Sequence, residues 1–345
     1  MEIEMTPKML ASEAAEILGV TIQAIHKQLK SKNLPYFKLK NRIYFSYETA
    51  KQMFIDFISP CLVVVFVLVK GGVGKSTLCR ETAIQSTLMG KRTLILEIDH
   101  QGNLTKSFEV NAQNYPVLID LFEKPELDIK KSIVNVIPGL DILPSRYDNC
   151  VLDNFLMLKR VPLQKAIKEK VEQLRKDYDL ILIDCPPNLG QAVASAVLCS
   201  DLIVMPTTPC DFSDSGVDIT NREIKKMLSD YDAKDIPRKI ILNKFDNREK
   251  DSRETHANLL KHEEYGDMMF GGYIRKCKEI ETYRKRKSSV FESISVTVGR
   301  EDIHTFTCEL LGMNDLPNKA LKNEIEDDEK VYQSKNVESE TVVNF

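Results

Sequence analysis

The chain has 345 residues, of which 43% are hydrophobic and 29% are charged, and its formal net charge is −3. These values describe a globular chain long enough for one large domain and a small one. They exclude a strongly basic nucleic-acid-binding protein, so any affinity for DNA must come from local basic patches.

Two further features bear on the compartment. The longest uncharged apolar run, residues 57–69, is too short to span a bilayer, and no signal peptide is visible. The eight cysteines are scattered without a C-x-x-C pair, which favours reduced, buried thiols over a disulfide or metal framework. We therefore expect a cytoplasmic protein without a membrane partner.

Residues 1–55 are expected to form a separate small domain. Helical periodicity covers Ala11–Leu18 and Ile22–Ser31, with a glycine break between them. A hairpin is predicted over residues 36–45, followed by a short helix over Tyr47–Phe54. Helix, tight turn, helix and hairpin are the outline of a winged helix-turn-helix, and the segment resembles the MerR-like group.

The charge of this domain is consistent with DNA binding. The stretch Ile22–Arg42 contains six Lys or Arg and no acidic residue. The side chains expected to face DNA are Gln23, His26, Lys27 and Lys30 of the second helix and Lys38, Lys40 and Arg42 of the hairpin. The alternative is a helical cap with a solvated basic face, because the same outline occurs in protein-docking modules.

From Cys61 onward, apolar strands alternate with helices. The predicted strands cover residues 62–69, 93–98, 180–183, 202–205 and 239–242, and the predicted helices cover residues 78–89, 163–176, 191–199 and 217–229. Short apolar strands with helices between them predict an α/β fold, with a doubly wound, mostly parallel sheet covered on both faces. Such sheets bind ligands at the carboxyl ends of their strands.

A glycine-rich loop joins the first of these strands to its helix. The residues expected to bind nucleotide phosphates are Lys70, Gly71, Gly72, Val73, Gly74, Lys75, Ser76 and Thr77. Backbone N–H groups of such a loop surround the phosphates, while Lys75 would reach the β/γ-phosphates and Ser76 would bind Mg²⁺. The usual pattern has a glycine six residues before the lysine, where this chain has Val69, and a second lysine, Lys70, begins the loop.

Acidic residues follow two of the predicted strands. Asp184 directly follows residues 180–183, the usual place for the acid on the Mg²⁺ side of a P-loop protein. Asp99 follows the second strand and is a candidate for orienting the attacking water. The alternative for each is a strand-end acid that caps the next helix, which explains one lone Asp better than two acids beside a phosphate loop.

The motifs KGGVGKST, EIDHQGNLT and DYDLILIDCPPNLG resemble the ParA family of partition ATPases with a deviant Walker A motif, close kin of MinD, over roughly residues 63–292. The resemblance implies an ATP-bound sandwich homodimer in which Lys70 reaches the partner's nucleotide. It also implies that Lys75 is the P-loop lysine, Ser76 and Asp184 are on the Mg²⁺ side, and Asp99 positions the hydrolytic water.

The chain departs from the family pattern at three positions. Glu97, His100 and Cys185 stand where the family usually has Asp, Pro and Thr. None of these changes removes a group that the mechanism needs. His100 lies beside Asp99 and could alter the surroundings of the water, so the hydrolysis rate stays open.

The fifth predicted strand ends in Asn243-Lys244-Phe245-Asp246, which on its own looks like the guanine-reading motif of GTPases. Related partition ATPases place an Asn beside adenine at this point, and the segment after Asp184 lacks the D-x-x-G of GTPases. We therefore predict ATP and Mg²⁺ as cofactors, with Asn243 among the nucleotide-binding residues.

A basic run, Arg275–Lys287, has seven Lys or Arg and two Glu. A solvated charge run is the alternative interpretation. In ParA-like proteins the matching region lies on a face that binds DNA without sequence preference, and the resemblance implies this role for Arg248, Arg275 and Lys278. Phosphate contacts of this kind are sensitive to salt.

The predicted organisation is a winged helix-turn-helix domain at 1–55, a ParA-like ATPase domain at 56–312 and an acidic, disordered tail at 313–345. The resemblance implies a plasmid or chromosome partition ATPase on the nucleoid, with hydrolysis stimulated by a ParB-like partner and possible repression of its own operon. The alternatives are a nucleotide-regulated transcriptional repressor and a MinD-like positioning ATPase. The absence of a basic amphipathic tail argues against the latter.

Overall fold

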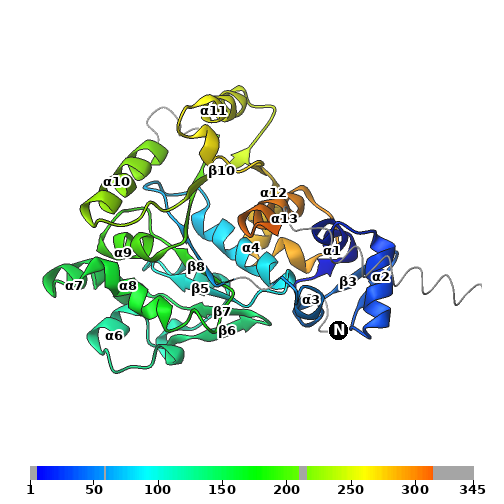
Figure 1. The fold of residues 1–345 in the computed structure, drawn as a ribbon, viewed down its shortest axis with the longest axis horizontal. Helices are drawn as coiled ribbons and strands as arrows, with labels where there is room; N and C mark the ends of the chain where they lie inside the picture. The colour runs from blue at the N-terminus through cyan, green and yellow to red at the C-terminus, as the bar shows by residue number, and fades with distance from the viewer. Residues whose placement is uncertain (1–5, 58–59, 210–215, 314–345) are drawn as a thin grey trace, which may run out of the picture.

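The computed structural model describes residues 6–57, 60–209 and 216–313. Its centre is an eight-stranded sheet with the strand order β11-β10-β9-β4-β8-β5-β7-β6 (Figure 1). Seven strands run parallel, and β6 is antiparallel to β7. The bounds are β4 Leu62–Phe66, β5 Thr93–Glu97, β6 Val134–Ile137, β7 Leu140–Leu143, β8 Leu180–Asp184, β9 Leu202–Thr207, β10 Arg238–Phe245 and β11 Ile274–Arg275. The predicted α/β class with a mostly parallel sheet is confirmed.

Helices cover both faces of this sheet. The helices that follow β4 are α4 Lys75–Leu88, α5 Asn103–Ser107, α6 Leu118–Glu123, α7 Leu152–Leu158, α8 Leu163–Glu172, α9 Gln191–Cys199, α10 Gly216–Asp230, α11 Lys250–Lys261, α12 Lys278–Lys285 and α13 Val298–Leu310. The buried side chains form two clusters, one with α6 to α10 and the other with α4 and α13.

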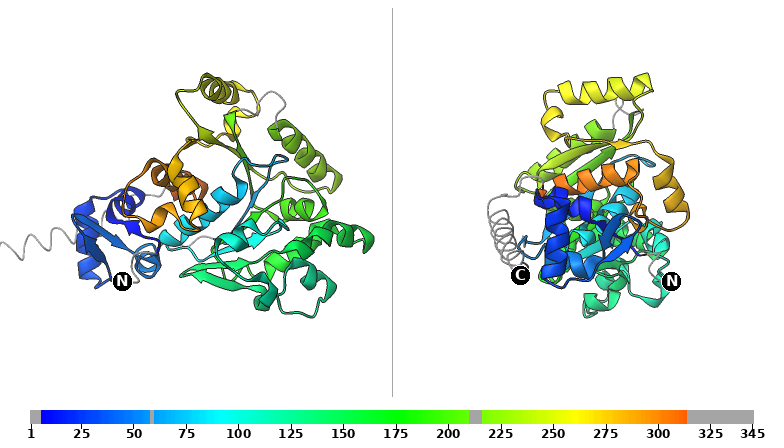
Figure 2. Two further views of the ribbon diagram at one scale, coloured as in Figure 1. Left: turned by 180° about the vertical axis from the view of Figure 1, so that it is seen from behind. Right: turned by 90° about the vertical axis from the view of Figure 1, so that its right-hand side faces the viewer.

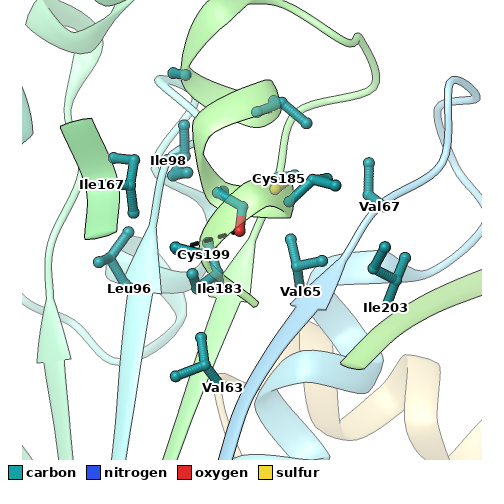
Figure 3. Close-up of a cluster of buried hydrophobic side chains, with 14 of the residues drawn as sticks. Val63, Val65, Val67, Leu96, Ile98, Ile167, Ile183, Cys185, Cys199 and Ile203 are labelled. Carbon is teal, nitrogen blue, oxygen red and sulfur yellow. Dashed lines mark hydrogen bonds between the residues drawn. The ribbon is translucent and has the colours of Figure 1, made fainter. Parts of the chain in front are cut away.

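The alternation of side chains along β4 explains why it is apolar throughout. Val63 and Val65 point into the first cluster, toward α8 and α9, where Figure 3 shows them beside Ile183 and Ile203. Val64 and Phe66 belong to the second cluster, with α4 and α13. A strand that is buried on both faces needs apolar residues at every position. Because β4 is packed on both faces, it is a rigid support for the loop that follows it.

The structure corrects several predicted boundaries. The strand expected over residues 62–69 ends at Phe66, and the helix expected from Leu78 begins at Lys75, inside the phosphate loop. The helix expected over residues 163–176 ends at Glu172. Strands β6, β7 and β11 were not predicted, since each is short and lies toward an edge of the sheet.

The N-terminal unit has the predicted helices and hairpin, together with a short strand, β1, that was not predicted, and its third helix ends at Met53 instead of Phe54. The elements of the unit are β1 Met9–Leu10, α1 Ala11–Leu18, α2 Ile22–Ser31, β2 Phe37–Leu39, β3 Arg42–Phe45 and α3 Tyr47–Met53, with a small sheet in the order β1-β3-β2. Thr21 caps α2 by accepting from Ala24 N–H at 3.1 Å. The assignment of this unit as a winged helix-turn-helix stays a prediction, as does the domain boundary at residue 55.

The N-terminal unit packs tightly against the larger body. Two views show it beside α13 and the end of α4 (Figure 2). The second cluster joins Met9 and Phe45 of the unit to Leu88 of α4 and Phe291, so the two parts share one core. The backbone N–H of Lys8 donates to Phe291 O at 2.8 Å.

A buried ion pair completes this contact. Arg300 of α13 is fully buried, and its Nη2 donates to Glu13 Oε2 of α1 at 2.8 Å. The same guanidinium donates to Ser293 O at 2.7 Å and to Lys8 O. A buried charge is tolerated only when it is paired and hydrogen-bonded in this way, so the orientation of α1 on the body is specified.

The predicted tail, apart from Met313, lies outside the described residues. None of the helices in the described ranges is long and apolar enough to cross a membrane.

Candidate active site

The predicted phosphate loop lies at the carboxyl end of β4, near the middle of the sheet. Gly72 and Gly74 have φ values of +78° and +98°, the left-handed region that favours glycine. A Cβ on Gly74 would lie 2.2 Å from Asn243 Nδ2, so no other residue fits there without displacing Asn243. The glycines therefore allow a tight turn that leads directly into α4.

Lys75 begins α4 and is almost completely buried. Its Nζ donates to Lys70 O at 2.9 Å and to Leu68 O at 3.1 Å, so the ammonium lies inside the curve of the loop. Burial lowers the pKa of Lys75, and the carboxylates of Asp184 and Asp99 oppose this effect. A desolvated cation at this position is ready to bind an anion that enters the loop.

Ser76 and Asp184 meet beside the loop. Ser76 Oγ donates to Asp184 Oδ2 at 2.6 Å, while Asp184 Oδ1 is buried and has no hydrogen-bond partner among the described residues. Burial, followed by the nearby Glu97, raises the pKa of Asp184 well above its ordinary value. An orphaned buried carboxylate oxygen next to a serine hydroxyl suits Mg²⁺ or one of its waters.

The described ranges contain no group of three or more His, Cys, Asp or Glu side chains arranged to hold a metal ion. Mg²⁺ at phosphate sites usually takes one or two protein ligands and completes its coordination with water and phosphate oxygens. Ser76 and Asp184 therefore fit the cofactor predicted from the sequence.

Asp99 is a third acidic residue of this region, near enough to Lys75 and Asp184 for its charge to favour the protonated form of both. It follows β5, is 7% exposed and accepts the N–H of Gln101 at 3.0 Å through Oδ1. The His100 Nδ1 is 3.9 Å from Asp99 Oδ1, and the His100 ring packs edge-on against Tyr147, with centroids 5.8 Å apart. The carboxylate is thus fixed at the edge of the cleft, while His100 is turned toward Tyr147.

Glu97 stands where the ParA family usually has Asp, and its side chain holds the start of α5. Its carboxylate accepts the N–H groups of Leu104 at 2.7 Å and Thr105 at 2.9 Å, at the N-terminal end of α5. Burial raises the pKa of Glu97 to about 7, although these hydrogen bonds oppose the rise. The longer side chain reaches α5 and fixes the loop that carries Asp99.

The end of β10 forms another wall. Asn243 Nδ2 donates to Val73 O at 2.8 Å, and Lys244 Nζ donates to Gly72 O at 2.9 Å. Asp246 does not line the cleft, and Arg248 holds both of its carboxylate oxygens, at 2.9 Å and 2.7 Å. The acid that would read guanine in a GTPase is therefore engaged elsewhere.

These elements enclose a cleft of about 750 Å³. Lys75, Ser76, Thr77, Asp99 and Asn243, all predicted from the sequence, line it together. Its outer wall is α12 and the residues around it, including Arg284, Lys285 and Lys287. We predicted this basic run as a DNA surface only, and nothing in the sequence indicated that it also faces the nucleotide cleft.

The predicted DNA-contacting residues of the body differ in their surroundings. Arg248 has a side chain that is 89% exposed and pairs with Asp246. Arg275 is 41% exposed and is held by Asp302 at 2.6 Å and by Glu301 at 3.3 Å, so two acids offset its charge. Lys278 is exposed at the start of α12.

The predicted DNA-contacting residues of the N-terminal unit lie far from the cleft, on the outer side of the molecule where Figure 1 shows α2. Gln23 and Lys30 are exposed, and His26 and Lys27 are half-buried. Burial and the neighbouring Lys30 and Lys38 lower the pKa of His26. Arg42 is exposed and donates to Ile294 O of the body, so the hairpin is tied down at one point.

The parallel sheet, the glycine-rich loop, the buried lysine and the Ser76–Asp184 pair define a P-loop nucleotide-binding domain. The AAA domain family matches residues 62–236, just over half of the chain. The chain belongs to this family, and the relatives that it resembles include proteins of the ParA family.

Two relatives illustrate the similarity. A ParA family protein of Mycoplasma genitalium is 34% identical over 167 residues, which cover 45% of this chain and 62% of that protein. The chromosome partitioning protein ParA of Caulobacter vibrioides is 24% identical over 221 residues, 63% of this chain and 81% of that protein. The match to the Mycoplasma relatives thus spans about three fifths of their length.

Two crystal structures share the fold. One is a cobyrinic acid a,c-diamide synthase from Mycobacterium smegmatis with bound ATP analogue and magnesium, with a TM-score of 0.62, 22% identity and coverage of 73% of this chain and 94% of that one. The other is a putative plasmid partition protein from Borrelia burgdorferi bound to AMPPNP, with a TM-score of 0.58, 18% identity and coverage of 74% and 99%.

Proposed function

We propose that this chain is a ParA-type ATPase that uses ATP and Mg²⁺ to control DNA partition. The observation that carries the proposal is the convergence of Lys75, Ser76 and Asp99 on one cleft at the carboxyl ends of the strands, with the buried Asp184 accepting from Ser76 Oγ. The names of the relatives, ParA family protein and chromosome partitioning protein, point in the same direction.

The residues of the chain divide the work of hydrolysis. The N–H groups of the loop and the start of α4 bind the phosphates, and Lys75 Nζ exchanges its carbonyl partners for phosphate oxygens. Ser76 and Asp184 would hold Mg²⁺, which when bound neutralises charge on the phosphate oxygens. Asp99 orients the attacking water.

Lys70 completes the site from a second copy of the chain. It is exposed at the mouth of the loop and does not line the cleft of its own protomer. A lysine in this position can extend toward a facing protomer, which supports a sandwich homodimer that forms on ATP binding. Hydrolysis would then release the two protomers.

ATP is the preferred nucleotide. Asn243 lines the cleft beside the phosphate loop, and Arg248 engages Asp246, the acid that would otherwise recognise guanine. ATP or its analogues occupy the related structures of cobyrinic acid a,c-diamide synthase and the Borrelia protein.

DNA is the proposed partner of the ATP-bound dimer. Lys278 and the basic end of α12 offer a sequence-independent phosphate-binding surface, which would place the dimer on the nucleoid. The exposed side of α2, with Gln23 and Lys30, is the proposed reader of an operator or centromere sequence. A ParB-like partner would stimulate hydrolysis, and operator binding would repress the operon.

The test compares steady-state and single-turnover ATP hydrolysis with and without DNA and a ParB-like protein. We expect slow basal turnover that requires Mg²⁺ and is lost in Lys75→Ala, while the exposed-lysine control Lys168→Ala on α8 retains it. Hydrolysis that persists in Lys75→Ala, or a wild-type chain that neither binds nor hydrolyses ATP, would contradict the proposal.

The second candidate is a transcriptional repressor in which the nucleotide only sets the dimer state. The attachment of the N-terminal unit through Arg300 and Glu13 favours this candidate, since these contacts offer a route by which the state of the dimer reaches α1 and α2. The two functions separate in Asp99→Asn, which would retain operator repression but lose partition if hydrolysis is the essential step.

A further inference from the structure

Lys244 is a residue of the cleft to which the proposed function assigns no role. It lines the cleft, and its Nζ donates to Gly72 O at 2.9 Å. The preceding residue, Asn243, donates to Val73 O at 2.8 Å. Two successive side chains of β10 therefore hold two successive carbonyls of the phosphate loop.

The backbone of β10 is deformed where this happens. Lys244 has a φ of +58°, which is uncommon for a residue with a side chain. The pairing of β10 with β11 shifts its register between Asn243 and Phe245, as at a β-bulge. In a regular strand, successive side chains point to opposite faces, so the deformation is what brings Asn243 and Lys244 to the same loop.

The two held carbonyls determine where the N–H groups of the loop point. In a planar trans peptide, the C=O of one residue and the N–H of the next point in opposite directions. Holding Gly72 O and Val73 O toward β10 therefore directs the N–H groups of Val73 and Gly74 away from it, into the curve of the loop. Those N–H groups are the ones that a phosphate would meet.

We propose that Lys244 is a positioning residue for the nucleotide, which acts with Asn243 as a clamp on the peptide planes of the phosphate loop. The inference rests on the proposed binding of ATP at this loop. The clamp orders the loop before the nucleotide arrives, so the loop loses less conformational freedom on binding.

The test measures the dissociation constants of fluorescent ATP and ADP for the full chain and its variants. Lys244→Met should weaken both nucleotides by about tenfold, the loss of one charge-assisted hydrogen bond. Lys244→Arg should restore most of the affinity. In steady-state hydrolysis, Lys244→Met should raise KM while kcat stays within about twofold, because the amine touches the loop rather than the reacting atoms.

Two controls separate the clamp from a general effect on folding. Lys239→Met removes a lysine of the same strand whose Nζ lies 3.5 Å from Asp267 O and Met269 O, outside the cleft, and should leave both affinities unchanged. Lys244→Gly keeps the backbone at its positive φ without strain and should bind as weakly as Lys244→Met. Hydrogen exchange of residues 71–74 should be faster in Lys244→Met and Lys244→Gly than in wild type.

Three results would overturn the clamp. The first is wild-type affinity in Lys244→Met, the second is wild-type affinity in Lys244→Gly, and the third is a loss confined to ATP, which would mean direct contact with the γ-phosphate. A wild-type chain that binds no nucleotide overturns the proposed function and the clamp together, whereas tight binding by both wild type and Lys244→Met overturns the clamp alone.

Discussion

At the scale of single residues, substitution of Asp99 should separate ATP binding from ATP hydrolysis. Its carboxylate lines the cleft and accepts from Gln101 N–H at 3.0 Å. Asp99→Asn keeps the shape but weakens the polarisation of a water. We expect single-turnover hydrolysis to fall at least about 100-fold while ATP affinity stays within about threefold.

The control for this experiment is Gln101→Ala, whose backbone N–H still donates to Asp99. It should retain most of the wild-type turnover. If Asp99→Asn hydrolysed ATP at the wild-type rate, the water-orienting role would belong to another residue, and His100 would be the next to examine because its ring lies beside Asp99.

The sequence predicted the site residues that depend on local order along the chain. Lys75, Ser76 and Asp184 could be placed because each follows an apolar strand, and the ends of parallel strands meet at one edge. The hydrogen bond from Lys244 Nζ to Gly72 O could not be predicted, since it depends on a positive φ and a register shift that no residue pattern indicates. The ion pair between Arg275 and Asp302 could not be predicted either, because Asp302 lies on α13, far along the sequence from Arg275.

At the scale of elements, the short helix α5 depends on Glu97. Helices of this length have little stability of their own, and the carboxylate of Glu97 takes two of the N–H groups at its start. Glu97→Asp shortens the side chain by one methylene and should withdraw it from Leu104 and Thr105. We expect a loss of about 1–2 kcal/mol in the free energy of unfolding and slower hydrolysis, measured by urea denaturation and single turnover.

Thr105→Ser is the matched control for Glu97→Asp. It keeps the hydroxyl that donates to Glu97 and accepts from Ser145 N–H, so both readouts should stay close to wild type. Wild-type stability in Glu97→Asp would show that Asp reaches α5 equally well, and the longer side chain would then have no structural consequence.

The basic helix α12 carries a second prediction at this scale. Lys278 is exposed, so Lys278→Ala should lower the affinity for random DNA uniformly and reduce the salt slope by about 1, with ATP affinity unchanged. Arg275→Ala should instead lower stability by about 1–3 kcal/mol, because the largely buried Asp302 loses the guanidinium and keeps only the backbone N–H of residue 275. DNA binding at rising salt and thermal unfolding give the two readouts.

Lys168→Ala is the control for charge alone, since Lys168 is an exposed lysine on α8, across the sheet from α12. An unchanged salt slope in Lys278→Ala would support the solvated charge run that the sequence also allowed.

Helices and strands could be predicted from the sequence wherever burial on both faces or a clear helical period imposed a pattern on the residues. Three helices, Ala11–Leu18, Ile22–Ser31 and Gln191–Cys199, have their predicted bounds. Strands β6 and β11 escaped prediction because they lie at the two edges of the sheet, where one face or one side lacks the burial that makes a strand apolar. Their existence depends on neighbours that are distant in sequence.

At the scale of the molecule, the nucleotide loop and the N-terminal unit are connected by one chain of contacts. The helix α4 starts in the loop, and its Glu81 accepts from Ser289 Oγ at 2.6 Å. The segment that follows Ser289 bonds to Lys8, and Arg300 bonds to Glu13 of α1. A change at the loop therefore has a direct structural route to α1 and α2, which the sequence alone did not indicate.

His304 of α13 makes this junction sensitive to acid. It is buried, its Nδ1 lies 2.6 Å from Gln85 Nε2 of α4, and its Nε2 faces Cys308 of α13 and Glu16 of α1. Burial lowers the pKa of His304 below 6.5, and the nearby Arg300 adds to this, while Glu13 and Glu16 oppose it. A neutral imidazole that accepts from Gln85 satisfies these contacts without a buried charge.

The consequence is a loss of stability on acidification. In the unfolded chain this histidine takes up a proton as the pH falls through about 6.5, whereas the folded protein resists it, so unfolding is favoured below that pH. We expect the free energy of unfolding to fall between pH 7 and pH 5, and the fall to be smaller in His304→Gln, which cannot titrate. Urea denaturation at several pH values measures this, and NMR titration of the labelled imidazole gives its pKa directly. A His304 that titrates above 6.5 in the folded protein would mean that Glu13 and Glu16 outweigh burial, and the junction between the N-terminal unit and the body would then gain stability on acidification.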